Sequence, residues 1–161
     1  MTLQLKKFGP QDFNDYFRLV SDRRVMAMIT ERALPEEEAR TDFNNLLENN
    51  AIHPALGQFK ILNSLSGQFL GLAKLEIASA GEETAELGYM ILPEFWGRGI
   101  AGQVAKRLID TAERQPDIVS LFAIIDPANL PSRKILINNQ FISREFKDFD
   151  GLPGEVLERA C

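Results

Sequence analysis

Hydrophobic residues in the first third of the chain recur with the period of a helix. Between Phe13 and Val20 they lie three or four positions apart, which places them on one helical face. A first strand is predicted at residues 3–8, and a Gly-Pro pair separates it from this helix. A second helix is predicted after Leu34, because a proline and three glutamates suit its first turn. The apolar segment at residues 25–30 is too short to assign.

From residue 58 onwards apolar and polar positions tend to alternate, which is typical of strands. This alternation predicts three strands, at residues 59–62, 69–77 and 85–92, which are separated by short polar turns. A strongly periodic segment with one apolar stripe follows and predicts a helix over residues 100–114.

The last third of the chain returns to strands. The almost unbroken apolar run at residues 119–125 predicts a strand covered on both faces. A short helix at residues 132–139 and two final strands, 141–149 and 156–159, paired across the turn at 150–154, complete the order β-α-α-β-β-β-α-β-α-β-β. This order predicts an α+β, or mixed α/β, fold with one central sheet. At 161 residues the chain suits a single domain, residues 1–161.

The loop before the helix at residues 100–114 is the segment that most clearly indicates a ligand site. Trp96 to Ala101 reads Trp-Gly-Arg-Gly-Ile-Ala, and a third glycine follows at position 102. Such a loop exposes backbone N–H groups at the positive end of a helix, which suits phosphate or pyrophosphate. A tight structural turn is the alternative. Glycine at a helix entrance costs roughly 0.5–1 kcal/mol relative to alanine, so three glycines favour anion binding.

Composition excludes several classes of function. A net charge of -5 argues against direct nucleic-acid binding, which requires a basic face. No apolar run reaches the ~20 residues of a membrane span, and no signal-peptide pattern opens the chain, so a cytoplasmic protein is expected. Cys161 is the only cysteine and His53 the only histidine, so we expect no disulfide and no metal site.

Two motifs in the right order resemble the GNAT superfamily of acetyl-coenzyme A-dependent N-acetyltransferases. The family's phosphate loop reads Gln/Arg-x-x-Gly-x-Gly/Ala, and residues 96–101 match it except at Trp96. Asn129-Leu-Pro-Ser132, followed by an apolar helix and Asn-Gln-Phe141, is similar to the family's Asn-x-x-Ser and Gly-Phe, with Gln140 in place of the glycine. The aromatic residue at position 96 resembles the branch that acetylates the N-termini of ribosomal proteins.

The resemblance implies a fold and a cofactor site. The implied sheet is a single twisted, mixed and mostly antiparallel one, in which the fourth strand splays from the fifth. Backbone groups of the fourth strand and of the loop would hold acetyl-coenzyme A (acetyl-CoA), which is a co-substrate, and no metal is implied. The implied cofactor-binding residues are Met90, Ile91, Leu92, Trp96, Gly97, Arg98, Gly99, Ile100, Ala101 and Asn129. Arg98 could add positive charge to this site, but an exposed arginine that faces solvent explains its presence at least as well.

The chemistry needs a base to deprotonate the amine, and Glu86, beside the implied catalytic strand, is the first candidate. Glu76 is the second candidate and Glu155 the third; a structural or solvated role for Glu86 stays open. By resemblance Ser132 lies beside the departing sulfur, although it could instead be a helix N-cap. Many relatives carry a tyrosine acid where this chain has Leu136, so that acid is absent here.

The resemblance implies direct transfer to a primary amine, with a protein or peptide N-terminus as the preferred acceptor. A small polyamine or antibiotic amine is the alternative acceptor, and a homodimer is possible. Two other classes of protein stay open at this point. One is a non-catalytic acyl-CoA sensor, and the other is a dinucleotide-binding module, because residues 97–102 also fit Gly-x-Gly-x-x-Gly.

Overall fold

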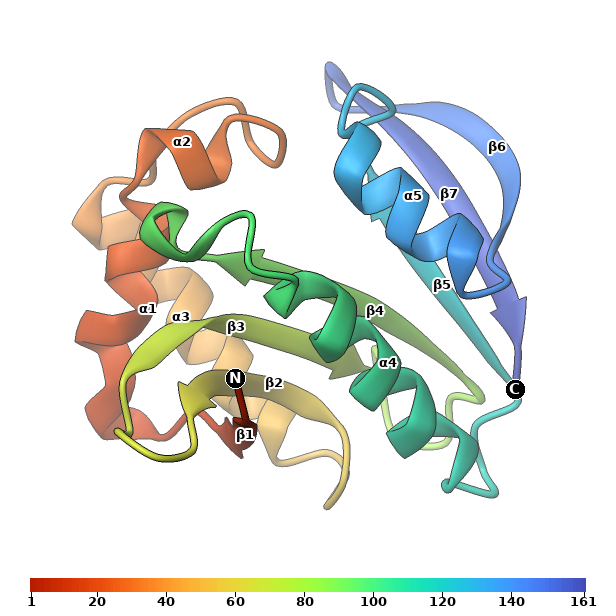
Figure 1. The fold of residues 1–161 in the computed structure, drawn as a ribbon, viewed down its shortest axis with the longest axis horizontal. Helices are drawn as coiled ribbons and strands as arrows, with labels where there is room; N and C mark the ends of the chain where they lie inside the picture. The colour runs from red at the N-terminus through yellow and green to blue at the C-terminus, as the bar shows by residue number, and fades with distance from the viewer.

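The computed structural model describes residues 1–161, and Figure 1 shows its arrangement. Seven strands carry most of the fold: β1 (Leu3–Lys7), β2 (Gly57–Asn63), β3 (Phe69–Glu76), β4 (Thr84–Ile91), β5 (Ser120–Ile125), β6 (Ile142–Phe149) and β7 (Leu152–Ala160). The helices are α1 (Phe13–Val20), α2 (Arg23–Met26), α3 (Glu36–Asn50), α4 (Ile100–Glu113) and α5 (Leu130–Asn138), with 3₁₀ turns η1 (Pro10–Asp12) and η2 (Pro93–Phe95).

All seven strands form one sheet in the order β1-β2-β3-β4-β5-β7-β6. Every neighbouring pair is antiparallel except β4 and β5, which are parallel. The predicted mixed and mostly antiparallel sheet is therefore confirmed. The predicted order of helices and strands is also confirmed, with α2 and the two 3₁₀ turns as additions.

Helices cover the sheet from both sides. In Figure 1, α4 and α5 lie in front of the sheet and α3 lies behind it. The helix α4 packs against β3 and β4, whereas α1 and α3 pack against β3 and β2. One continuous core runs through these contacts, and its fully buried members include Leu19, Ile61, Leu75, Val104 and Leu157. The periodic apolar stripe of the sequence thus becomes the sheet-facing side of α4.

The strands β4 and β5 pair over only a short length. The register joins Thr84 to Ser120 and ends with Glu86 opposite Phe122. Beyond that point β4 pairs only with β3, and β5 only with β7. The two strands visibly diverge in Figure 1, as a splayed pair should. One edge of β4 is therefore left without a strand partner in the middle of the sheet.

Three predictions about individual elements were wrong. The strand β5 is not covered on both faces: Leu121 and Ala123 are buried, but Ile124 is 38% exposed. The reason is that α1 and α3 pack mainly against β3 and β2, which leaves part of β5 uncovered. The turn between β6 and β7 contains only Asp150 and Gly151, both with positive φ, which suits a two-residue hairpin better than the longer turn we expected.

The third wrong prediction concerns the start of α5. The helix begins at Leu130, two residues before the predicted start, because the Asn129 side chain accepts a hydrogen bond from the Ser132 amide and caps it. Ser132 therefore lies in the first turn of α5. The alternative in which Ser132 is the N-cap is excluded.

Gly71 on β3 allows the close approach of β3 to β4. It lies opposite Ile91, and a Cβ at position 71 would overlap the carbonyl oxygen of Met90. Because the overlapping atom is backbone, it cannot simply rotate away. Gly71 thus fixes the position of the strand whose other edge is free.

We expect Gly71→Ala to lower the free energy of unfolding by about 1–3 kcal/mol, since it overpacks a buried site. Gly102→Ala is the matched control. Its Cβ would enter open space within α4, so it should leave stability unchanged or raise it by up to about 1 kcal/mol. Urea unfolding of both variants measures this difference. Equal effects from the two substitutions would contradict the role assigned to Gly71.

Candidate active site

The loop between η2 and α4 is built on two glycines with left-handed backbone. Gly97 has φ 76° and Gly99, the N-cap of α4, has φ 75°. L-residues rarely adopt this conformation, which explains the glycines. A Cβ at either position would meet nothing within 4 Å, so the surface beside the loop is open. Buried Phe95 and Ile100 anchor the two ends of the loop in the core.

From Gly97 onwards, the backbone N–H groups of this loop make no hydrogen bonds within the protein. Those of residues 97–102 have no hydrogen-bond acceptor within the protein, and the first turn of α4 contains no acidic side chain. These amides and the helix dipole together make a site for an anion. Arg98 is exposed, and its guanidinium lies 5.4 Å from the centre of the Phe95 ring, which it can stack on.

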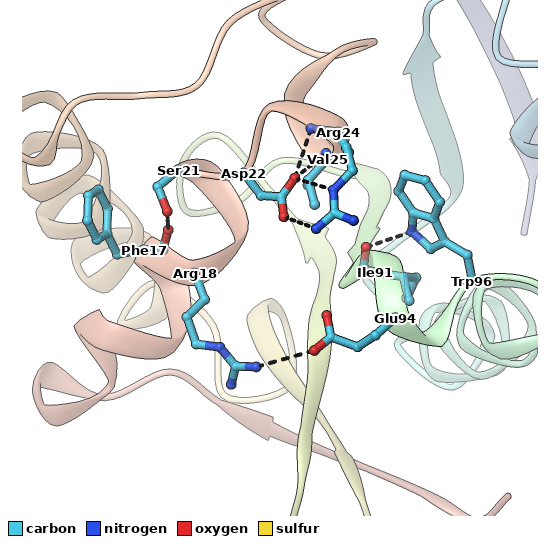
Figure 2. Close-up of polar contacts among 9 residues, drawn as sticks. All are labelled: Phe17, Arg18, Ser21, Asp22, Arg24, Val25, Ile91, Glu94 and Trp96. Atoms are coloured by element: carbon cyan, nitrogen blue, oxygen red, sulfur yellow. Dashed lines mark hydrogen bonds and ion pairs between the residues drawn. The ribbon is translucent and has the colours of Figure 1, made fainter.

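Trp96 ties the loop to the end of β4. Its indole N–H donates a hydrogen bond of 2.8 Å to the carbonyl oxygen of Ile91, as Figure 2 shows, while 51% of the residue stays exposed. The tryptophan thus satisfies a backbone group on the edge of β4 that β5 no longer reaches. This contact explains why an aromatic donor stands at the first position of the loop motif.

Met90, Ile91 and Leu92, the predicted cofactor-binding residues at the end of β4 and just after it, are not equivalent. The amide of Leu92 donates to the carbonyl of Leu70 on β3, at 2.9 Å. Because ladder pairs alternate in an antiparallel sheet, the backbone groups of Met90 also face β3. Those of Tyr89 and Ile91 face the opposite side, where β5 has moved away. The sequence could not distinguish these positions, since their orientation depends on the strand register.

Tyr89 joins β4 to α5 across the diverging strands. Its hydroxyl donates a hydrogen bond of 3.1 Å to Oγ of Ser132, which is buried. Burial raises the pKa of Tyr89 above its usual value, although the hydrogen bond to Ser132 works in the opposite direction. Tyr89 was not among the predicted site residues. Nothing in the sequence links two residues 43 positions apart.

The first two candidate bases lie side by side. Glu86 on β4 and Glu76 on β3 are cross-strand partners, and both line a pocket of about 220 Å³ together with Glu82, Thr84 and Phe122. Glu86 is ion-paired with Lys74 at 3.1 Å and keeps a quarter of its side chain exposed. Glu76 accepts a hydrogen bond of 3.0 Å from Gln58. Both carboxylates are therefore accessible and neither is free of partners.

The third candidate base, Glu155, and the residues His53 and Leu136 do not line this pocket. Glu155 is fully buried, and the Nε of Arg133 binds both its oxygens at 3.0 and 3.2 Å, so it is a structural ion pair. His53 lies after the end of α3, 3.2 Å from Asp117. Leu136 is buried in α5 and offers no proton donor. No group of three His, Cys, Asp or Glu side chains could hold a metal ion.

The segment around α2 lies next to the open end of β4. The ion pair of Arg18 and Glu94, at 4.0 Å, joins α1 to η2 (Figure 2). The side chain of Asp22 caps α2, and beyond this short helix Met28 and Ile29 are each 43% exposed. This apolar surface suits contact with an acceptor. None of the helices is both long and apolar enough to cross a membrane.

Comparison with known proteins identifies the family. The model of the acetyltransferase (GNAT) domain matches residues 2–142, so the chain belongs to the GNAT family. It is an acetyl-CoA-dependent transferase, and the dinucleotide-binding interpretation is wrong. An uncharacterised N-acetyltransferase p20 from Bacillus licheniformis is 21% identical over 158 residues, which are 97% of this chain and 88% of that protein.

Solved structures of the family share the fold. A spermidine N-acetyltransferase from Vibrio cholerae, in complex with CoA and spermine, has a TM-score of 0.80 at 17% identity, covering 98% of this chain and 95% of that one. A ribosomal L7/L12 alpha-N-protein acetyltransferase in complex with CoA has a TM-score of 0.78 at 18% identity, covering 99% and 94%. These similar scores do not favour one branch of the family over the other.

Proposed function

We propose that this protein transfers an acetyl group from acetyl-CoA directly to a primary amine within a ternary complex, and that the amine is the N-terminus of a protein or peptide. The main support for this proposal is that the backbone N–H groups of residues 97–102, at the start of α4, have no hydrogen-bond acceptor within the protein. They would bind the pyrophosphate of CoA, since no acidic side chain or capping group competes for them. Asn129, which caps α5, would contact the same cofactor.

The free edge of β4 would hold the pantetheine arm. The backbone groups of Tyr89 and the amide of Ile91, whose carbonyl already accepts from Trp96, face this edge. This supports them as hydrogen-bond partners for the arm and, near the thioester, for the developing oxyanion. In this proposal Met90 and Leu92 contribute side-chain contacts, because their amides face β3. The indole of Trp96 would form one wall of the entrance.

The acetyl group would move in a single displacement. The amine nitrogen attacks the thioester carbonyl carbon, a C–N bond forms, and the C–S bond breaks with its electron pair on sulfur. The amine loses one proton to Glu86 or, through water, to the solvent. Ser132 would donate a hydrogen bond to the departing sulfur. No nucleophilic side chain is required, and Cys161, at the end of β7, gives no reason to expect an acetylated enzyme intermediate.

The weakness of the available bases favours an N-terminal amine as the acceptor. No histidine lies near the free edge of β4, and the carboxylates there are held by Lys74 and Gln58. At pH 7 about 10% of an α-amino group is unprotonated, against less than about 0.1% of a lysine or similar alkyl amine. An N-terminal amine therefore reacts with little help. The resemblance of the loop to the ribosomal-protein branch points the same way.

A small polyamine is the second candidate acceptor, because one observation favours it. The pocket that contains Glu76, Glu82 and Glu86 has Phe122 in its lining. Carboxylates and an aromatic ring attract alkyl ammonium groups. A polyamine could place one ammonium group there and a second amine at the thioester. The homodimer and the cytoplasmic location stay predictions.

The phosphate loop can be tested by charge. Gly99→Glu should raise the Kd of CoA about 10- to 100-fold, because it brings a carboxylate close to the diphosphate. Gly67→Glu is the matched control, since Gly67 has nearly the same φ, 76°, and equally open surroundings in the β2–β3 turn. Calorimetry measures both affinities, and Trp96, the only tryptophan, gives a fluorescence signal beside the loop. Equal affinities would refute the loop assignment.

The base can be tested through the pH dependence of the rate. Glu86→Gln should lower kcat about 10- to 100-fold at pH 6, and the deficit should shrink as pH approaches the pKa of the amine. Above that pKa the amine is already unprotonated and needs no base. Glu83→Gln, an exposed neighbour, should leave the profile unchanged. If the pH profile of Glu86→Gln runs parallel to that of the wild type, Glu86 is not the base that deprotonates the amine.

The acceptor can be identified by mass. Peptides with a free N-terminus should gain one acetyl group faster than spermidine, and N-terminally blocked peptides with an internal lysine should react slowest. Thiol release gives the rates. Preference for spermidine, abolished by Glu82→Gln, would support the second candidate instead. CoA binding without transfer to any amine would indicate a non-catalytic sensor.

A further inference from the structure

We propose that Tyr89 is a positioning residue that orients the Ser132 hydroxyl towards the departing thiolate, an inference that rests on the proposed function. The two side chains come from opposite sides of the diverging strands, Tyr89 from β4 and Ser132 from the helix that follows β5. Their hydroxyls form the hydrogen bond of 3.1 Å described above.

The direction of this hydrogen bond determines where the Ser132 proton can point. Tyr89 donates, so Oγ of Ser132 is the acceptor. The Ser132 hydroxyl accepts this bond and donates none of the protein's side-chain hydrogen bonds. It is therefore available to a ligand atom beside the first turn of α5. A serine without the tyrosine could rotate and donate to a nearby carbonyl, as serines in helices often do.

Ser132 is also held from its backbone. Its amide donates to Oδ1 of Asn129 at 3.3 Å, and this fixes the first turn of α5 relative to the loop before it. Ser132 is only 8% exposed, so bulk water has little access to its hydroxyl. Asn129 and Tyr89 thus constrain the backbone and the side chain of Ser132 independently.

The position along β4 suits a thioester. Tyr89 lies three residues beyond Glu86, the last residue that pairs with β5, which corresponds to about 10 Å of strand. It lies two residues before Ile91, next to the phosphate loop. The hydroxyl pair thus lies between the phosphate loop and the end of the pairing with β5, along the free edge that would hold the pantetheine arm and its thioester.

The pKa values of the tyrosine phenol and of the departing thiol decide whether Tyr89 donates a proton or only a hydrogen bond. An alkyl thiol has a pKa of about 8.5, and an unperturbed tyrosine about 10. Burial raises the pKa of Tyr89 further. The phenol therefore keeps its proton when the C–S bond breaks, and the sulfur leaves as a thiolate that takes its proton from water. Tyr89 and Ser132 stabilise that charge by hydrogen bonding, without a net transfer of their own protons.

Tyr89 brings a hydroxyl to α5, where Leu136 has none. Leu136 stands where relatives carry a tyrosine, and its side chain is almost fully buried in α5. A hydroxyl from β4 can reach the first turn of α5 from the opposite side. Tyr89 would thus help stabilise the leaving group indirectly, through Ser132.

The test uses Tyr89→Phe, which keeps the ring that packs on the core and removes only the hydroxyl. We expect kcat to fall about 10-fold and the Kd of CoA to stay nearly unchanged. Loss of one buried hydrogen bond should lower the melting temperature by no more than about 6 °C, so the variant stays folded in the assay. The loss should be the same at every pH between about 6 and 9, because the phenol stays protonated over that range. Tyr16→Phe, at the only other tyrosine, is the matched control and should leave kcat unchanged.

A double-mutant cycle separates positioning from simple packing. Ser132→Ala should lower kcat at least as much as Tyr89→Phe, and the double variant should lie within about 2-fold of Ser132→Ala alone. Additive losses, or full activity of Tyr89→Phe in an otherwise active enzyme, would overturn the role of Tyr89 while leaving the acetyltransferase proposal intact. Absence of transfer by the wild type to any amine would overturn both.

Discussion

The early end of pairing between β4 and β5 is the constraint on which the rest of the site depends. A strand within a sheet normally satisfies its backbone groups on both edges, and each buried group left unsatisfied costs about 1–3 kcal/mol. Beyond Glu86, β4 has a strand partner on one edge only. The indole of Trp96 satisfies the Ile91 carbonyl, and Tyr89 links β4 to α5 by its side chain. The free edge is therefore maintained by side chains and not by a neighbouring strand.

Local signals in the sequence were sufficient for the order of most helices and strands. The helix α4 could be predicted from the sequence, because a helix that packs on a sheet repeats its apolar positions every three or four residues. The loop could be predicted from Gly97 and Gly99, because glycine is the residue that most easily adopts a left-handed backbone conformation. The apolar run of β5 misled us, since exposure of Ile124 depends on how far α1 and α3 reach across the sheet. Which strands a helix covers depends on the tertiary packing, so the residues of β5 alone could not predict it.

The site itself was predictable only where a motif is continuous in sequence. The loop before α4 fulfils that condition, and its open amides fit the prediction. Which residues of β4 face the free edge depends on the register with β3, and a shift of one residue would exchange Met90 for Ile91. The same holds for the carboxylates. Glu86 and Glu155 look alike in sequence, but one lies in an open pocket and the other is enclosed with Arg133.

Two helices of this protein use the same dipole in opposite ways. Neither α3 nor α4 has a side-chain N-cap, but the first turn of α3 contains Glu36, Glu37 and Glu38, whereas that of α4 contains no acid. Each acid near a helix N-terminus contributes about 0.3–1 kcal/mol, so α4 forgoes on the order of 2 kcal/mol that α3 obtains. A ligand present at 100 times its Kd stabilises the folded state by about 2.7 kcal/mol. Binding of a diphosphate at α4 would therefore offset this deficit, so the proposed ligand would stabilise the folded protein at the same place where it binds.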